Sequence, residues 1–254
     1  MSRCVMDPQP LLRLEEWYRS PLGIELAGLE ESCLERMLRD TFGYYLLQVG
    51  MGSGFSEALS SSRIRYRILL PVAERARTLG SQVVCEPDRM PVSSDSVDAV
   101  FLPHTLDFAA DARQVLREAE RVLIPEGRVV VMGFNSLSLW GLRRLVPPVG
   151  ARVPWCGSFL NPYRVCDWLS LLGFDVEMQE MMMFRPPWRR ALLEERSLLD
   201  SAGKRFWPLL GGVYAIRAVK RVSTLTPLKP RWKPRRAVLP GGAVEPTTRG
   251  TSSA

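Results

Sequence analysis

The feature that constrains this chain most is a glycine-rich turn between an apolar run and a predicted helix. The short run Tyr44 to Val49 is apolar and favours a buried strand. It leads into Gly50-Met-Gly-Ser-Gly54, and a helix is predicted to begin near Phe55. Glycine lets the backbone approach a ligand closely, and the N–H groups of a helix's first turn favour an electron-rich partner. The pattern therefore predicts either a ligand site at the end of a strand or a purely structural turn.

Strand and helix patterns alternate on the carboxyl side of this turn. Further strands are predicted over Arg65 to Leu70, Gln82 to Glu86, Val97 to Leu102 and Arg128 to Phe134. Helices are predicted between them over Val72 to Thr78 and Asp111 to Leu123. We therefore expect an α/β fold with a Rossmann-like, doubly wound, mostly parallel sheet and helices on both of its faces.

Three further parts of the chain surround these segments. Residues 1–42 are predicted to form an N-terminal helical extension, with helices over Leu11 to Arg19 and Pro21 to Thr41. Residues 43–221 are predicted to form the main domain, which contains an inserted cap over residues 136–211. The last predicted elements are helices over Leu137 to Leu145, Asn161 to Leu172 and Trp188 to Leu199, and strands over Phe174 to Met183 and Gly212 to Val219.

The third part, residues 222–254, is rich in proline and in basic residues. Its six Lys and Arg residues face the single acid Glu245 and account for most of the net charge of +7. Since it has almost no apolar periodicity, we expect this tail to be disordered. Its segment Lys229-Pro-Arg-Trp-Lys-Pro-Arg-Arg236 either contacts a nucleic acid or another anionic surface, or only keeps the chain in solution.

Composition excludes several classes of protein. Apolar residues make up 46% and charged residues 24% of the 254 residues, as in globular proteins. No apolar run reaches the roughly 18 residues of a membrane-spanning helix, and Asp7 and Pro8 fall where an export signal needs apolar residues, so we expect a cytoplasmic protein. The five cysteines are scattered and form no C-x-x-C pair, which indicates neither a disulfide framework nor a zinc site, and no metal is expected.

Several motifs, in chain order, carry a family resemblance. They are the glycine turn, Val83-Val-Cys-Glu-Pro-Asp-Arg-Met-Pro-Val92, the run Ser96 to Asp107 and the run Ala112 to Gly127. Over Tyr44 to Phe134 the chain resembles the class I S-adenosylmethionine-dependent methyltransferases, most of all their small-molecule "type 11" branch. The resemblance implies a transferase that moves a methyl group from S-adenosyl-L-methionine to a small or lipid-like acceptor.

The resemblance also implies a set of cofactor-binding residues at one edge of the sheet. The glycine turn would lie under the methionine and ribose parts of the cofactor, and Glu86 would face the adenine amino group. The end of the fourth strand would border the transferred methyl group and the acceptor. The implied set is Gln48, Gly50, Met51, Gly52, Gly54, Glu86, Pro87, Asp88, Met90, Leu102 and Pro103.

His104, the only histidine of the chain, follows the fourth predicted strand. A sulfonium already activates its methyl group, so a general base is needed only where the nucleophile must lose a proton. Histidine titrates near neutral pH, which makes His104 the candidate catalytic base. Alternatively, His104 only forms hydrogen bonds within its loop.

Two positions depart from the family's pattern. Gln48 stands where relatives usually have an acid, and an amide can still donate and accept hydrogen bonds. The second strand ends as Ile68-Leu-Leu-Pro71, without the carboxylate that normally holds both ribose hydroxyls. Losing such a partner lowers affinity roughly ten- to a hundredfold. Glu74 either reaches the ribose or is a solvated helix residue.

Other residues allow two interpretations each. Asp98 is expected to order the start of its strand, and Asp107 lies near the acceptor's opening or caps the next helix. The amphipathic run Leu137 to Leu145 carries adjacent cations beside an apolar face, which suits a transient membrane contact. Tryptophans and a run of methionines either line an acceptor pocket or form ordinary core: Trp140, Trp155, Trp168, Trp188, Trp207 and Met181-Met-Met183.

Two functions from different classes fit these features. One is a methyltransferase, and the other is a catalytically degenerate protein of the same fold that binds partners through its cap or basic tail. A dinucleotide-dependent oxidoreductase is disfavoured, because Phe55 stands where the last glycine of G-x-G-x-x-G would fall.

Overall fold

The computed structural model describes residues 10–52, 54–71, 86–146, 152–187, 207 and 209–221. All of them lie in one compact unit, Met1–Val222. Outside the described residues lie the predicted helices Val72 to Thr78 and Trp188 to Leu199, most of the predicted strand Gln82 to Glu86, Glu74, Trp188 and the tail 222–254.

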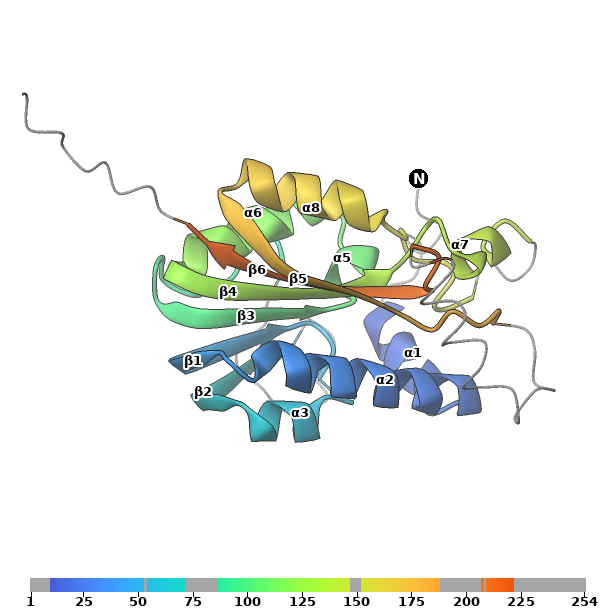
Figure 1. The fold of residues 1–254 in the computed structure, drawn as a ribbon, viewed down its shortest axis with the longest axis horizontal. Helices are drawn as coiled ribbons and strands as arrows, with labels where there is room; N and C mark the ends of the chain where they lie inside the picture. Colours follow the sequence, from blue (N-terminus) through green and yellow to red (C-terminus); the bar gives the residue numbers. More distant parts are fainter. Residues whose placement is uncertain are drawn as a thin grey trace, which may run out of the picture. The chain divides into compact units, whose positions relative to one another are not determined.

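A six-stranded sheet with the order β2-β1-β3-β4-β6-β5 forms the centre of the described structure (Figure 1). Strands β1 to β4 are parallel to one another, whereas β6 runs antiparallel to both β4 and β5. The strands are β1 (Phe42–Val49), β2 (Arg63–Leu70), β3 (Val97–Pro103), β4 (Leu123–Phe134), β5 (Phe174–Met182) and β6 (Val213–Lys220). The expectation of a Rossmann-like, mostly parallel sheet is therefore confirmed.

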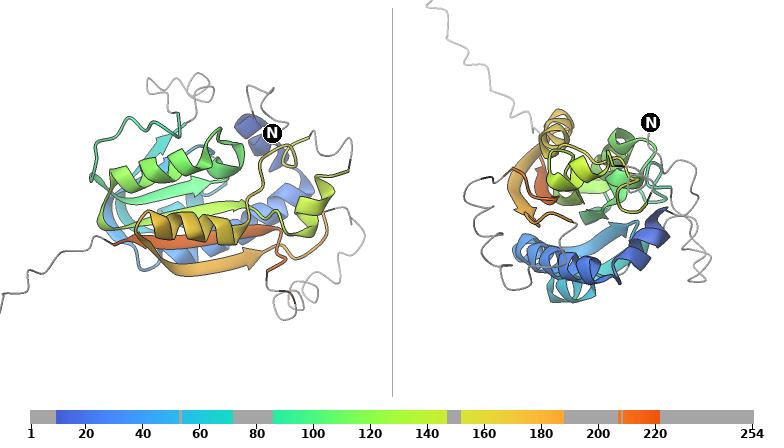
Figure 2. Two further views of the ribbon diagram at one scale, coloured as in Figure 1. Left: turned by 90° about the horizontal axis from the view of Figure 1, so that it is seen from above. Right: turned by 90° about the vertical axis from the view of Figure 1, so that its right-hand side faces the viewer.

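Helices cover both faces of this sheet (Figures 1 and 2). On one face lie α1 (Pro10–Trp17), α2 (Pro21–Leu38) and α3 (Ser56–Ser61). On the other lie α5 (Thr105–Phe108), α6 (Ala112–Val122) and α8 (Pro162–Leu171), while α7 (Leu139–Arg143) lies beyond the carboxyl end of β4. Alternate residues of β3 serve the two faces, since Phe101 packs in the cluster with α2 and Leu102 in the cluster with α6.

Local sequence explains where these helices begin. Ser20 caps α2, because its side chain accepts a hydrogen bond from Gly23 N at 3.1 Å, and Pro21 takes the first helical position. Asp111 caps α6 by accepting from the N–H groups of Arg113 and Gln114. The predicted cap function of Asp107 is therefore wrong.

Two elements differ from the sequence-based expectation. Strand β4 begins at Leu123, directly after α6, whereas the predicted strand begins only at Arg128. The short helix α5 was not predicted, because four residues are too few to show a helical period.

Candidate cofactor site

The glycine turn lies at the carboxyl end of β1, beside the ends of β2 and β3. Gly50 has φ of +103°, and its N–H donates to the Leu70 carbonyl at 3.0 Å. A Cβ at Gly50 would come within 2.9 Å of Thr105 Oγ1, which donates to the Val49 carbonyl at 2.6 Å. Both the left-handed backbone and this close approach therefore require glycine at position 50.

Gln48 stabilises the glycine turn through a hydrogen bond to its backbone. It is 5% exposed, and its Nε2 donates to the Met51 carbonyl at 2.5 Å. The Met51 side chain is buried in the core. Where the structure places them, Gln48 and Met51 act on the shape of the turn rather than on the space above it.

A cavity of about 340 Å³ opens above the turn. Four of the residues implied by the family resemblance line it, namely Gly50, Glu86, Pro87 and Asp88. Its remaining wall comes from residues that the sequence did not point to, on α1, on α5 and after it, and on α6: Pro10, Leu11, Leu12, Glu15, Thr105, Phe108, Ala109, Ala110 and Val115.

The other implied residues surround this cavity without lining it. Met90 and Leu102 are buried in the core on the α6 side of the sheet, and Pro103 is buried at the end of β3. Gly54 has φ of +97° and open space where a Cβ would stand. Gly52 donates its N–H to Glu15 Oε1 at 2.9 Å, which joins α1 to the glycine turn.

His104 lies in a fully buried polar cluster between β3 and α2. Its Nδ1 is 3.0 Å from Asp107 Oδ2, and its Nε2 is 2.9 Å from both Glu30 Oε1 and the Tyr18 hydroxyl. The Tyr18 hydroxyl donates to Glu30 Oε2 at 2.7 Å. Together, Tyr18, Glu30, His104 and Asp107 therefore tie the N-terminal helices to the end of β3.

This cluster shifts the pKa of its members. Burial lowers the pKa of His104, but the charge of Glu30 and the hydrogen bond with Asp107 outweigh it and raise that pKa to about 9. Burial raises the pKa of Asp107 and, more strongly, that of Tyr18. His104 is thus held as a cation between two carboxylates, with both ring nitrogens engaged by protein groups.

Asp98 and the tryptophans have clear positions. Asp98 Oδ2 accepts from the N–H groups of Tyr44 and Tyr45, both at 2.9 Å, so it orders the start of the neighbouring strand β1, whereas we expected it to order the start of its own strand. Trp140 and Trp155 are buried core residues, whereas Trp207 is 63% exposed. Trp168 packs partly buried against the core.

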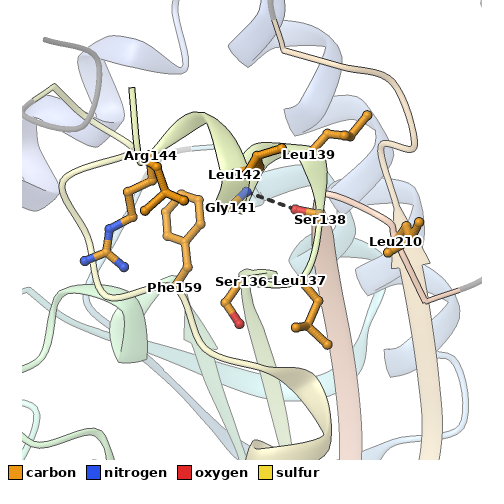
Figure 3. Close-up of a pocket in the computed structure, with 10 residues that line it drawn as sticks. Ser136, Leu137, Ser138, Leu139, Gly141, Leu142, Arg144, Phe159 and Leu210 are labelled. Atoms are coloured by element: carbon orange, nitrogen blue, oxygen red, sulfur yellow. Dashed lines mark hydrogen bonds between the residues drawn. The ribbon is translucent and has the colours of Figure 1, made fainter. Parts of the chain in front are cut away.

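A second cavity of about 660 Å³ lies beside the carboxyl end of β4 (Figure 3). Leucines dominate its wall, which includes Leu142 of α7, with Phe159 and Arg144 close to each other. Aromatic rings stand between this cavity and the polar cluster: Phe134 lies tilted against His104 at 4.3 Å and stacks on Phe159 at 4.9 Å, between ring centroids.

Within the part of the chain that the structure describes, no group of His, Cys, Asp and Glu could hold a metal ion. No helix there is long and apolar enough to cross a membrane. Cys33 and Cys166 are free, but Cys156 is disulfide-bonded, which the scattered spacing could not indicate because it carries no information on distant contacts.

The sequence and the fold of the chain are both similar to those of known methyltransferases. Residues 47–131 match the family model described as "Methyltransferase domain". The solved structures with this fold include an S-adenosylmethionine-dependent methyltransferase from Archaeoglobus fulgidus, with a TM-score of 0.53, 18% identity, and coverage of 76% of this chain and 94% of that one. One from Mesorhizobium loti has a TM-score of 0.51, 17% identity, and coverage of 74% and 96%.

A third similar structure is a chain from the Haloferax volcanii complex between the Trm112 methyltransferase activator and a methyltransferase. Its TM-score is 0.58 at 16% identity, with coverage of 85% of this chain and 99% of that one. In sequence, the chain is 34% identical over 230 residues to the uncharacterized protein YafS of Escherichia coli, which covers 87% of this chain and 88% of YafS. The chain belongs to the class I S-adenosylmethionine-dependent methyltransferase family.

Proposed function

We propose that this protein transfers the methyl group of S-adenosyl-L-methionine to a small or lipid-like acceptor. The observation that carries the proposal is the cavity above the glycine turn, where Gly50, Glu86 and Asp88 meet. Such crevices at the carboxyl ends of parallel strands are where open α/β sheets bind ligands. The residues present fit the cofactor, because carboxylates can accept from its hydroxyl and amino groups and the bare Gly50 leaves room for its sugar.

The bound cofactor would supply an already activated methyl group. The protein's task is therefore to hold and orient the cofactor and the acceptor and to exclude water. Gly50 and Gly52 would support the cofactor from the turn, with Glu86 and Asp88 beside its adenine. Leu11 and Leu12 of α1 would keep water from one side of the cavity. His104, buried and held by two carboxylates, suits a positioning role, in which it fixes the end of β3.

The second cavity supports the choice of acceptor. Its leucine-rich wall suits an aliphatic chain, and the Arg144 guanidinium suits an anionic group on that chain. Exposed apolar side chains continue around it, with Leu142 56% and Leu145 74% exposed. A fatty acid or an anionic lipid matches this combination better than a sugar or a nucleoside.

Calorimetric titration with S-adenosylmethionine and S-adenosylhomocysteine tests the cofactor. We expect micromolar binding to the wild-type protein and none to Gly52→Asp, because the new carboxylate would stand beside Glu15, which lines the cavity, and would repel it. Folding of the variant is checked by circular dichroism. If the wild-type protein binds neither ligand, the chain is a degenerate member of the fold and the proposal is wrong.

Transfer of a labelled methyl group to fatty acids and anionic lipids tests the acceptor. Leu142→Asp should reduce transfer, because a carboxylate in the second cavity would repel an anionic, aliphatic acceptor. Leu171→Asp is the matched control, since Leu171 is 78% exposed on α8 and does not line that cavity. Equal effects of the two variants would contradict a lipid-like acceptor bound there.

A further inference from the structure

We propose that Glu15 of α1 is the carboxylate that holds the ribose hydroxyls of the cofactor. This inference rests on the proposed function and adds a residue that the sequence did not single out. Glu15 is only 8% exposed and lines the same cavity as Gly50 and Glu86. Acids are rarely this buried, and the placement of this one in a ligand cavity points to a binding role.

Two sets of contacts fix the position of Glu15, one at its own carboxylate and one at Tyr18. Its Oε1 accepts from Gly52 N at 2.9 Å, which places the carboxylate at the glycine turn. One turn further along the chain, the Tyr18 hydroxyl is held by Glu30 at 2.7 Å and His104 at 2.9 Å. The buried cluster thus anchors α1, and α1 presents Glu15 to the cavity.

The end of β2 cannot serve the same purpose. It closes with Leu70, whose side chain is 5% exposed in the core and whose carbonyl already accepts from Gly50 N. Among the described residues, the acids that line the cavity are Glu15, Glu86 and Asp88, and of these Glu15 is the one hydrogen-bonded to the turn. The missing acid of β2 is therefore replaced by one from α1.

The chemistry of the two groups matches. A carboxylate offers about four acceptor positions on two oxygens, which suits two vicinal hydroxyl donors. Hydrogen bonds to an ionised acceptor are roughly twice as strong as those between neutral groups. Replacing Glu15 with Gln keeps its size and removes this charge.

Calorimetric titration of the full-length protein tests the inference with four ligands. S-Adenosylhomocysteine and adenosine carry both ribose hydroxyls, whereas 2′-deoxyadenosine and 3′-deoxyadenosine each lack one. Glu15→Gln should weaken the first two roughly ten- to a hundredfold and the deoxy ligands clearly less. Glu16→Gln, on the exposed side of the same helix, should change nothing. Glu15→Asp keeps the charge with a shorter reach, should give an intermediate loss, and is used if Glu15→Gln does not fold.

The remaining outcomes would overturn the inference. An equal loss for all four ligands means that Glu15 only shapes the glycine turn. Tighter binding by Glu15→Gln means that Glu15 obstructs the cavity. If the wild-type protein binds S-adenosylhomocysteine and Glu15→Gln binds it equally well, the inference is wrong but the proposed function stands. If the wild-type protein does not bind it, both are wrong.

Discussion

At the scale of single residues, the cation His104 makes folding depend on pH. Its pKa is raised from 6.5 to about 9 in the folded protein by Glu30 and Asp107. The folded state therefore binds the proton more tightly, so this stabilisation is complete below pH 6.5 and is lost as the pH rises through 9. We expect the free energy of unfolding to fall by about 3 kcal/mol between pH 6.5 and 9.5 in urea titrations.

Two measurements isolate His104. The chain has one histidine, so the imidazole proton signals in an NMR titration belong to it alone and should report a pKa near 9. His104→Asn suits the left-handed backbone at this position, where φ is +52°, and should remove most of the fall in stability between pH 6.5 and 9.5. A histidine that titrates near 6.5 in the folded protein would contradict this account.

Gly50 allows a second prediction at this scale. Gly50→Ala forces a side chain into a left-handed backbone and against Thr105 Oγ1, at 2.9 Å. We expect a loss of about 1–3 kcal/mol in unfolding free energy, together with weaker binding of S-adenosylhomocysteine. Gly54→Ala serves as the control, because it meets similar backbone strain but open space. The loss of stability in Gly54→Ala should be smaller than that in Gly50→Ala. A larger loss would show that contact with Thr105 is not what requires glycine at position 50.

At the scale of elements, two glycines of α2 should respond in opposite directions to the same substitution. A Cβ at Gly23 would lie 2.4 Å from the Trp17 carbonyl oxygen, so Gly23→Ala should push α1 away and lower stability by about 1–3 kcal/mol. Gly28 is exposed with nothing within 4 Å, so Gly28→Ala should raise stability by about 1 kcal/mol. Thermal melts of both variants check this, and two changes of the same sign would contradict it.

Local sequence patterns predicted some of the elements but not the contacts between distant ones. The period of α2 and the apolar run of β1 were visible locally, and the structure contains both. The site was predicted only in part: Gly50, Glu86 and Asp88 share a motif series, whereas Glu15 reaches the cavity through folding of α1 across the sheet edge. Similarly, no local pattern pairs Glu30 with His104, because 74 residues separate them.

At the scale of the whole molecule, aromatic rings connect the two helices that border the cavities. Trp17 of α1 lies 6.1 Å from Trp140 of α7 and 6.4 Å from Trp155, between ring centroids and edge to face. Trp140 and Trp155 in turn stack at 6.0 Å. Since α1 lines the cofactor cavity and α7 lines the second one, order in α1 should be transmitted to α7.

Hydrogen exchange followed by mass spectrometry tests this coupling. S-Adenosylhomocysteine should slow amide exchange in α1 directly and, to a smaller extent, in α7. Trp17→Leu should keep the effect on α1 but abolish it in α7, because it removes the rings' contact and no residue of the cavity. Trp207→Leu, a change at a 63% exposed tryptophan, should leave both effects intact. If α7 stays protected in Trp17→Leu, the two cavities communicate through Phe134 and His104 instead, whose rings lie 4.3 Å apart.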